Sequence, residues 1–199
     1  FGEGLTYKEF MESPIASPSI MKPELSEIDN GIALRDYEWE VKHHLKPHYV
    51  YIALTSNYKV GVTRSTNTPY RWIDQGATQA IILAEVPYRQ LAGLIEVSLK
   101  DHISDKTAWQ RMLKGEADTN KNIIEIRDQM AELVPKEYHS FLSNTHEVQH
   151  INYPVIQYPE KVKSLKLERE KIIEQKLVGI KGQYLIFEDG VMNVRSHSG

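Results

Sequence analysis

The sequence predicts an α+β fold. A small core of β-hairpin, helix, strand and helix would follow an irregular N-terminal arm and precede a helical connector and a C-terminal antiparallel β unit. Three observations support this: two β-branched, aromatic runs separated by turn residues, apolar residues at helical spacing after a buried run, and a turn signal between two apolar runs near the C-terminus. We expect the arm over residues 1–45, the core over 46–114, the connector over 115–150 and the β unit over 151–199.

The arm contains Pro14, Pro18 and Pro23 together with several glycines, which favours irregular structure with short helical turns, one of them around residues 7–11. The core begins with residues 49–54, which are β-branched and aromatic and predict a strand. Turn residues follow, and then a second strand-like run completes a hairpin.

The second half of the core alternates helix and strand. Pro69 can begin a helix over residues 70–75, and the mostly apolar run 80–86 predicts a buried strand. After Pro87, apolar residues recur at helical spacing, so a long helix is expected to about Ser104.

The connector and the C-terminal unit are predicted from weaker patterns. Residues 120–134 have one apolar face, with Asp118 or Thr119 as N-cap and Pro135 at the end, and residues 106–113 favour a further helical turn or two. Glu188-Asp189-Gly190 is a hairpin turn signal. Strand candidates in this unit are residues 155–158, 162–167, 177–180, 183–187 and 191–195.

Composition excludes several classes of protein. The chain has no cysteine, which excludes disulfides, thiolate zinc sites and cysteine nucleophiles. No apolar run approaches the roughly 20 residues of a membrane helix, and the first residues lack the charged start and apolar run of a signal peptide. We therefore expect a cytoplasmic protein with no membrane partner.

Charge is unevenly distributed along the chain. The net charge is -3, but residues 42–114 carry 10 basic and 5 acidic side chains, net +5, whereas residues 1–41 carry 3 and 9, net -6. Positive charge in the core suits an anionic ligand such as nucleic acid. Random variation between segments explains the same numbers equally well.

Four motifs occur in order in the core. Tyr49-Val50-Tyr51 lies on the first strand and Lys59-Val60-Gly61 on the second, Tyr70-Arg71-Trp72 lies on the first helix, and Leu94-Ile95-Glu96 lies on the second. Over roughly 65 residues this arrangement resembles the core of GIY-YIG nucleases. The resemblance implies a metal-dependent nuclease that hydrolyses phosphodiester bonds in nucleic acid, with DNA favoured over RNA.

The resemblance also implies roles for individual residues. Glu96 would bind Mg²⁺ or Mn²⁺, Arg71 would hold the phosphate, and Tyr51 would position or deprotonate the attacking water, which requires a depressed tyrosine pKa. Lys59 stands where the nucleases usually have tyrosine, and it could hold a phosphate or a water. Substrate contacts are expected from Gly61, Arg64, Trp72 and Gln75.

A second resemblance is to an uncharacterised bacterial family known only as a domain of unknown function. Residues 59–64, 71–76 and 105–107 carry it. Members of that family often have cysteine clusters before the core, and this chain has none.

Each candidate residue also has a purely structural explanation. Tyr51 and Trp72 could be core side chains, Gly61 could permit close packing, and Glu96 could pair with Lys100 four residues later. Two alternative functions therefore stay open: a non-catalytic nucleic-acid-binding module with a degenerate nuclease fold, and a protein-interaction domain in which Arg71 and Glu96 form a structural ion pair.

Overall fold

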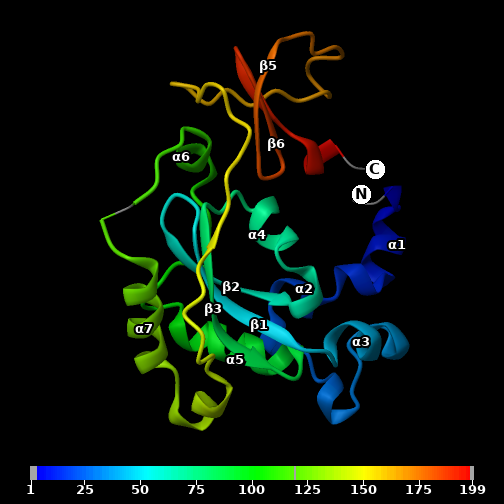
Figure 1. Cartoon of the computed structure of the whole chain (residues 1–199). Coiled ribbons are helices and arrows are strands. Elements are labelled where there is room, and N and C mark those ends of the chain that lie inside the picture. Colours follow the sequence, from blue (N-terminus) through cyan, green and yellow to red (C-terminus); the bar gives the residue numbers. More distant parts are fainter. Residues whose placement is uncertain (1–3, 119, 198–199) are drawn as a thin grey trace.

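β1 (His48–Leu54) is an inner strand of a four-stranded antiparallel sheet with the order β2-β1-β3-β4. It pairs with β2 (Tyr58–Arg64) and with β3 (Gln79–Val86), and β3 also pairs with the short strand β4 (Gln149–His150). A second antiparallel sheet has the order β5-β6-β7, so the predicted α+β class is confirmed. This computed structural model describes residues 4–118 and 120–197 (Figure 1).

The two faces of the larger sheet have separate cores because successive residues of a strand point to opposite sides. One face packs against α5 (Arg89–Leu99) and α7 (Ile123–Leu133). The other face carries Tyr51 and packs against Trp72 of α4 (Tyr70–Asp74). Helices therefore cover both faces of β1, which explains its nearly continuous burial.

The long helix α5 ends earlier than its apolar spacing predicts. It stops at Leu99 rather than near Ser104. The amide of Val60 donates a hydrogen bond to the carbonyl oxygen of Ser104 at 2.8 Å, and Ser104 forms a parallel bridge with Lys59. Beyond the helix, Ser104 thus satisfies one backbone donor on the open edge of β2.

The N-terminal arm is more ordered than predicted. Its prolines begin short turns, as expected from their fixed φ, but the helix α3 was not predicted. The side chain of Asp36 caps α3 by accepting a hydrogen bond from the Trp39 amide at 2.7 Å. In order, the arm consists of α1 (Tyr7–Glu12), η2 (Pro14–Ala16), α2 (Pro18–Met21), η3 (Pro23–Leu25), η4 (Ile28–Asn30) and α3 (Tyr37–His44).

The arm is held directly against α5. Arg89, the first residue of that helix, donates hydrogen bonds to the carbonyl oxygens of Ser19 at 2.8 Å and Ile20 at 2.9 Å. One turn later, a Cβ on Gly93 would lie 2.2 Å from the backbone nitrogen of Glu24 and within 2.6 Å of Pro23. The absence of a side chain at Gly93 therefore permits the backbone of the arm to lie on the helix.

Two buried histidines lie where the arm meets the sheet. His44 is 2% exposed, and its Nδ1 shares a hydrogen bond of 3.1 Å with the Ser26 hydroxyl. Burial lowers the pKa of His44 to about 3, and the charge of Arg89 acts in the same direction. Burial also lowers the pKa of His48 to about 4. Both side chains are therefore neutral at pH 7.

The connector and the C-terminal unit differ from expectation in detail. The N-cap of α7 is Asn122, whose Oδ1 accepts from the Ile124 amide at 2.9 Å. It is not Asp118, and Thr119 lies outside the described residues. The remaining elements are η5 (Ser65–Asn67), α6 (Trp109–Leu113), η6 (Lys136–Phe141), β5 (Leu177–Lys181), β6 (Tyr184–Phe187), β7 (Gly190–Asn193) and η7 (Val194–His197).

The strands predicted at residues 155–158 and 162–167 are not formed. Val155 makes only an isolated bridge to Gly179, and Ser164 makes one to Val191. This stretch instead covers the smaller sheet, with Leu165 buried beside β7. Isolated apolar residues in these two ranges match the strand pattern. Each range bonds to an edge of the smaller sheet at single points only, so neither forms a strand.

Replacement of Gly93 by alanine tests the docking of the arm. In a helix, glycine to alanine normally stabilises by about 1 kcal/mol. Here we expect Gly93→Ala to lower the free energy of unfolding and to speed proteolysis within residues 13–31, because the new Cβ collides with the arm. Gln90→Ala on the same helix is the control. Equal or greater stability of Gly93→Ala would contradict the prediction.

Acid should weaken the protein through His44. Its folded pKa of about 3 lies below the ordinary 6.5, so the unfolded chain takes up the proton first as the pH falls. The stabilisation is complete above about pH 6.5 and decreases until about pH 3. We expect urea unfolding of His44→Asn to depend less on pH over this window than the wild type, with the exposed His150→Asn as control. Parallel pH profiles of wild type and His44→Asn would disprove this role.

Candidate active site

Tyr51 lies at the centre of the candidate site. It is fully buried on β1, directly opposite Gly61 of β2. A Cβ on Gly61 would lie 2.6 Å from the Tyr51 hydroxyl oxygen and 2.7 Å from Cζ. The phenol ring can lie across β2 only because Gly61 has no side chain. The tyrosine on β1 therefore requires a glycine at the opposite position on β2.

Gln75 connects Tyr51 to Arg71. With its amide oxygen toward Arg71, Gln75 accepts hydrogen bonds from Nε at 3.1 Å and Nη2 at 3.0 Å, and its amide nitrogen donates to the Tyr51 hydroxyl at 2.9 Å. The reverse orientation would place amide N–H groups against the guanidinium donors. α4 and its C-cap residue thus supply both Arg71 and the group that links it to the tyrosine.

The pKa of Tyr51 does not move in the direction expected for a base. Burial raises it to about 12, although the charge of Arg71 acts in the opposite direction. The expected depression is therefore wrong for this structure, because desolvation of the phenolate outweighs the nearby guanidinium. Tyr51 is a hydrogen-bonding group here rather than a proton acceptor.

Lys59 lies on the same face of β2 as Gly61 and is 5% exposed. Burial lowers its pKa to about 8, and the charge of Arg71 acts in the same direction, while Glu96 and Asp105 oppose the shift. Near neutral pH, part of the population therefore has a neutral amine, which can accept a proton.

Glu96 comes from α5 and is 8% exposed. Burial raises its pKa, Lys100 lowers it, and Asp105 and Glu24 raise it further. The predicted structural contact with Lys100 is present, with Nζ 3.9 Å from Oε2, but Lys100 also lies 3.7 Å from Asp105. The partly exposed Lys100 thus forms ion pairs with both carboxylates. Glu96 pairs with Lys100 and not with Arg71.

Two of the predicted substrate contacts lie elsewhere. Arg64 has the opposite parity on β2 to Gly61, and its Nη1 lies 2.8 Å from Nδ1 of His43 in the arm. Trp72 is 3% exposed and meets Tyr51 edge-on at 5.9 Å. Its ring is a wall of the core, so the expectation that it contacts substrate is not supported.

Sequence reasoning missed two charged residues. Glu24 of the arm and Arg89 of α5 both influence this region: Glu24 raises the pKa of Glu96, and Arg89 interacts electrostatically with Glu96, Arg64 and Arg71. Arg89 is seven residues before Glu96, a helical spacing that could have suggested a shared face. Glu24 gave no signal, since the arm showed no periodic pattern.

A divalent cation would find few ligands here. Within residues 4–118 and 120–197, no three acidic or histidine side chains are grouped closely enough to hold a metal ion. Glu96 offers one desolvated carboxylate, and the buried Oε2 of Glu24 has no hydrogen-bond partner in the described part of the chain. Mg²⁺ commonly takes only one or two carboxylates and keeps several waters. Glu96 could supply one such carboxylate.

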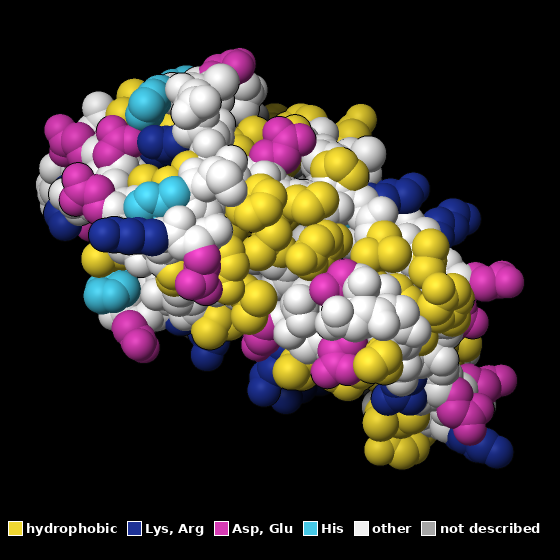
Figure 2. Space-filling model, turned by 90° about the horizontal axis from the view of Figure 1, so that it is seen from below, with side chains coloured by type: hydrophobic (Ala, Val, Ile, Leu, Met, Phe, Trp, Pro, Cys, Tyr) yellow, Lys and Arg dark blue, Asp and Glu magenta, His cyan; other side chains and the backbone are white. Residues whose placement is uncertain are grey.

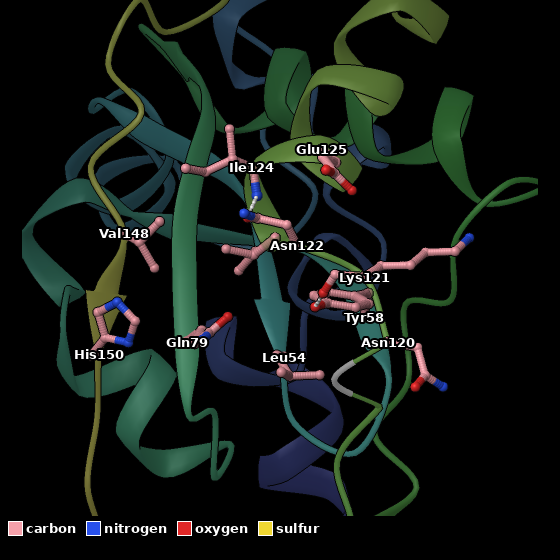
Figure 3. Close-up of a pocket in the computed structure, with 11 residues that line it drawn as sticks. Leu54, Tyr58, Gln79, Asn120, Lys121, Asn122, Ile124, Glu125, Val148 and His150 are labelled. Atoms are coloured by element: carbon pink, nitrogen blue, oxygen red, sulfur yellow. Dashed lines mark hydrogen bonds between the residues drawn. The ribbon is translucent and has the colours of Figure 1, made fainter.

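A separate cavity lies elsewhere in the molecule. It has a volume of about 560 Å³ and lies between α7, the hairpin turn and β4 (Figure 3). None of the predicted site residues lines it. Two of its polar groups make internal hydrogen bonds: the Asn122 side chain caps α7, and the Tyr58 hydroxyl donates to the carbonyl oxygen of Lys121.

The molecular surface seen from below shows no extended basic field. In Figure 2, Lys and Arg side chains are scattered among Asp and Glu side chains around a central group of hydrophobic ones. Within the described residues, no helix has the length and apolar character needed to cross a membrane. On this face, an anionic backbone would find no continuous complementary surface.

The family model described as "Protein of unknown function (DUF2797)" matches residues 1–199. The chain belongs to the DUF2797 family. The DUF2797 match covers the arm and the C-terminal unit as well as the core, so these flanks are part of the family pattern. No curated protein matches the chain, and no solved structure does.

Replacement of Gly61 by alanine tests the contact that places Tyr51. The added Cβ would displace the phenol, and we expect a loss of about 1–3 kcal/mol in the free energy of unfolding. The control is the same replacement in a Tyr51→Leu background, where the hydroxyl and ring are absent. The cost should then be smaller, as a double-mutant cycle would show. Additive effects would mean that the contact is unimportant.

Proposed function

We propose that this protein is a metal-dependent nuclease with a GIY-YIG-like core that hydrolyses phosphodiester bonds in nucleic acid. The observation that supports it is the grouping of five residues named from the motif order. Tyr51, Gly61 and Arg71 are joined by direct contacts and by Gln75, and Lys59 is coupled electrostatically to Arg71 and Glu96. These residues come from two strands and two helices, so their association does not follow from sequence proximity.

Each side chain has a role that suits its surroundings. Arg71, which donates two hydrogen bonds to the side-chain oxygen of Gln75, would contact the phosphate and stabilise charge that develops on its oxygens. Tyr51 would orient the attacking water by hydrogen bonding. Lys59, whose pKa is lowered by burial, would accept the proton from that water.

Glu96 would hold the cation, Mg²⁺ or Mn²⁺. The bound ion would stabilise negative charge on the phosphate and on the leaving oxygen. Arg71 and Gln75 are half-buried and line a cleft, so a phosphate can approach the cluster from the α4 side.

The second candidate is a nucleic-acid-binding module without turnover. The complete burial of Tyr51, its raised pKa, and lysine in place of the second motif tyrosine favour it. The third candidate, a protein-interaction domain, requires a structural ion pair between Arg71 and Glu96. Glu96 pairs with Lys100 instead, which removes the observation that favoured it.

Cleavage assays with Glu96→Gln separate these candidates. Purified full-length protein would be incubated with supercoiled, branched and single-stranded DNA and with RNA, in Mg²⁺ or Mn²⁺. We expect cleavage by the wild type and a loss of at least about 100-fold in Glu96→Gln, with a similar loss in Arg71→Ala. Calorimetry should show that Glu96→Gln also loses Mn²⁺ binding.

The matched control is Glu85→Gln, an exposed glutamate at the end of β3. It should retain both cleavage and metal binding. If wild type and Glu96→Gln are equally inactive but bind nucleic acid, the second candidate replaces the first. If neither binds nucleic acid, both are rejected.

A further inference from the structure

A cleft of about 320 Å³ lies where Arg71 and Gln75 reach the surface, between α4, α6 and the C-terminal sheet. Figure 1 shows that sheet above α4 and beside α6. Asp74, Trp109, Tyr184 and Arg195 also line the cleft. The cleft therefore joins the candidate active site to the C-terminal unit. The proposed hydrolysis assigns no other role to that unit.

The cleft is fixed by contacts between the two units. The turn from β5 to β6 touches α4, since a Cβ on Gly182 would lie 2.9 Å from the carbonyl oxygen of Asp74. The Tyr153 hydroxyl donates to the carbonyl oxygens of Ile73 at 3.1 Å and Ala77 at 2.9 Å, and the buried Lys181 lies over the Tyr153 ring. These contacts hold the smaller sheet at a defined position beside Arg71.

One side of the cleft is aromatic. Trp109 of α6 and Tyr184 of β6 stack with ring centroids 5.8 Å apart and planes 2° from parallel. Both rings are only partly buried and both line the cleft. A rigid aromatic pair of this kind offers a flat surface to another ring, and nucleobases stack on such surfaces whatever their identity.

The charged groups are arranged around this surface. Arg71 and Arg195 contribute two positive charges, and Asp74 contributes one negative charge. Guanidinium groups bind phosphate through paired N–H donors, whereas a carboxylate accepts hydrogen bonds from base N–H groups. The combination of one aromatic wall, two arginines and one carboxylate matches the parts of a single nucleotide.

We propose that this cleft binds one unpaired nucleotide of a single-stranded nucleic acid, with the base against Tyr184 and Trp109 and the flanking phosphates on Arg71 and Arg195. The proposal rests on the proposed function, because Arg71 is shared with the candidate active site. A base must leave its stack to reach the aromatic wall, so single strands are favoured over duplexes.

The test is a binding measurement without catalysis. Fluorescein-labelled oligo(dT), oligo(rU) and a DNA duplex of equal length are titrated with the full chain in EDTA, with fluorescence anisotropy as the readout. We expect tighter binding of the single strands than of the duplex. Tyr184→Leu should weaken single-strand binding about fivefold or more, and Tyr184→Phe, which keeps the ring, should not.

Arg195→Gln provides an independent arm. It should weaken single-strand binding and reduce the slope of log K against log salt by about one. The control is Arg169→Gln, an exposed arginine of the same unit that does not line the cleft. Because Arg195 is exposed, we expect Arg195→Gln to fold. It therefore tests the cleft proposal even if Tyr184→Leu does not fold. Preference between oligo(dT) and oligo(rU) separates DNA from RNA.

The outcomes separate this proposal from the nuclease proposal. If single-strand binding depends on Tyr184 and Arg195 but no cleavage occurs with either Mg²⁺ or Mn²⁺, the proposal for the cleft is upheld and the nuclease proposal is rejected. If cleavage depends on Glu96 while Tyr184→Leu and Arg195→Gln bind single strands as wild type does, the cleft is rejected. Equal binding of duplex and single strand also overturns it.

Discussion

The close approach of the Tyr51 ring to the backbone of Gly61 is the contact on which the site depends. Because the phenol occupies the space of a missing side chain, its hydroxyl lies buried beside β2 and meets Gln75. Gln75 in turn orients Arg71. Gly61 thus determines where the Tyr51 hydroxyl lies. Through the side-chain amide of Gln75, it also determines where the Arg71 guanidinium lies.

Burial acts in opposite ways on the two titratable groups of the hairpin. It raises the pKa of Tyr51 and lowers that of Lys59, because each charged form loses hydration. The same environment therefore keeps the phenol protonated as a hydrogen-bonding group and makes the amine available as a proton acceptor. Lysine in the second motif is consistent with this division of roles, in which the tyrosine keeps its proton.

The flanking segments are structural parts of the same molecule. The arm lies on α5 because Gly93 leaves room for it and Arg89 binds its carbonyl groups, which brings Glu24 close enough to influence Glu96. On the other side of the site, the C-terminal sheet forms one wall of the cleft beside Arg71. The match of the family model over all 199 residues agrees with this, since both flanks belong to the family pattern.

The sequence by itself determined the hairpin and the helices of the core, because strand alternation and helical spacing depend on residues only a few positions apart. It also identified Arg71 and Gln75, which one helical turn brings together. Only the tertiary structure decided that Trp72 is buried, that Arg64 turns toward the arm, and that Tyr184 lies near Arg71. Burial and proximity across a hundred residues depend on how the whole chain packs, and no local pattern records them.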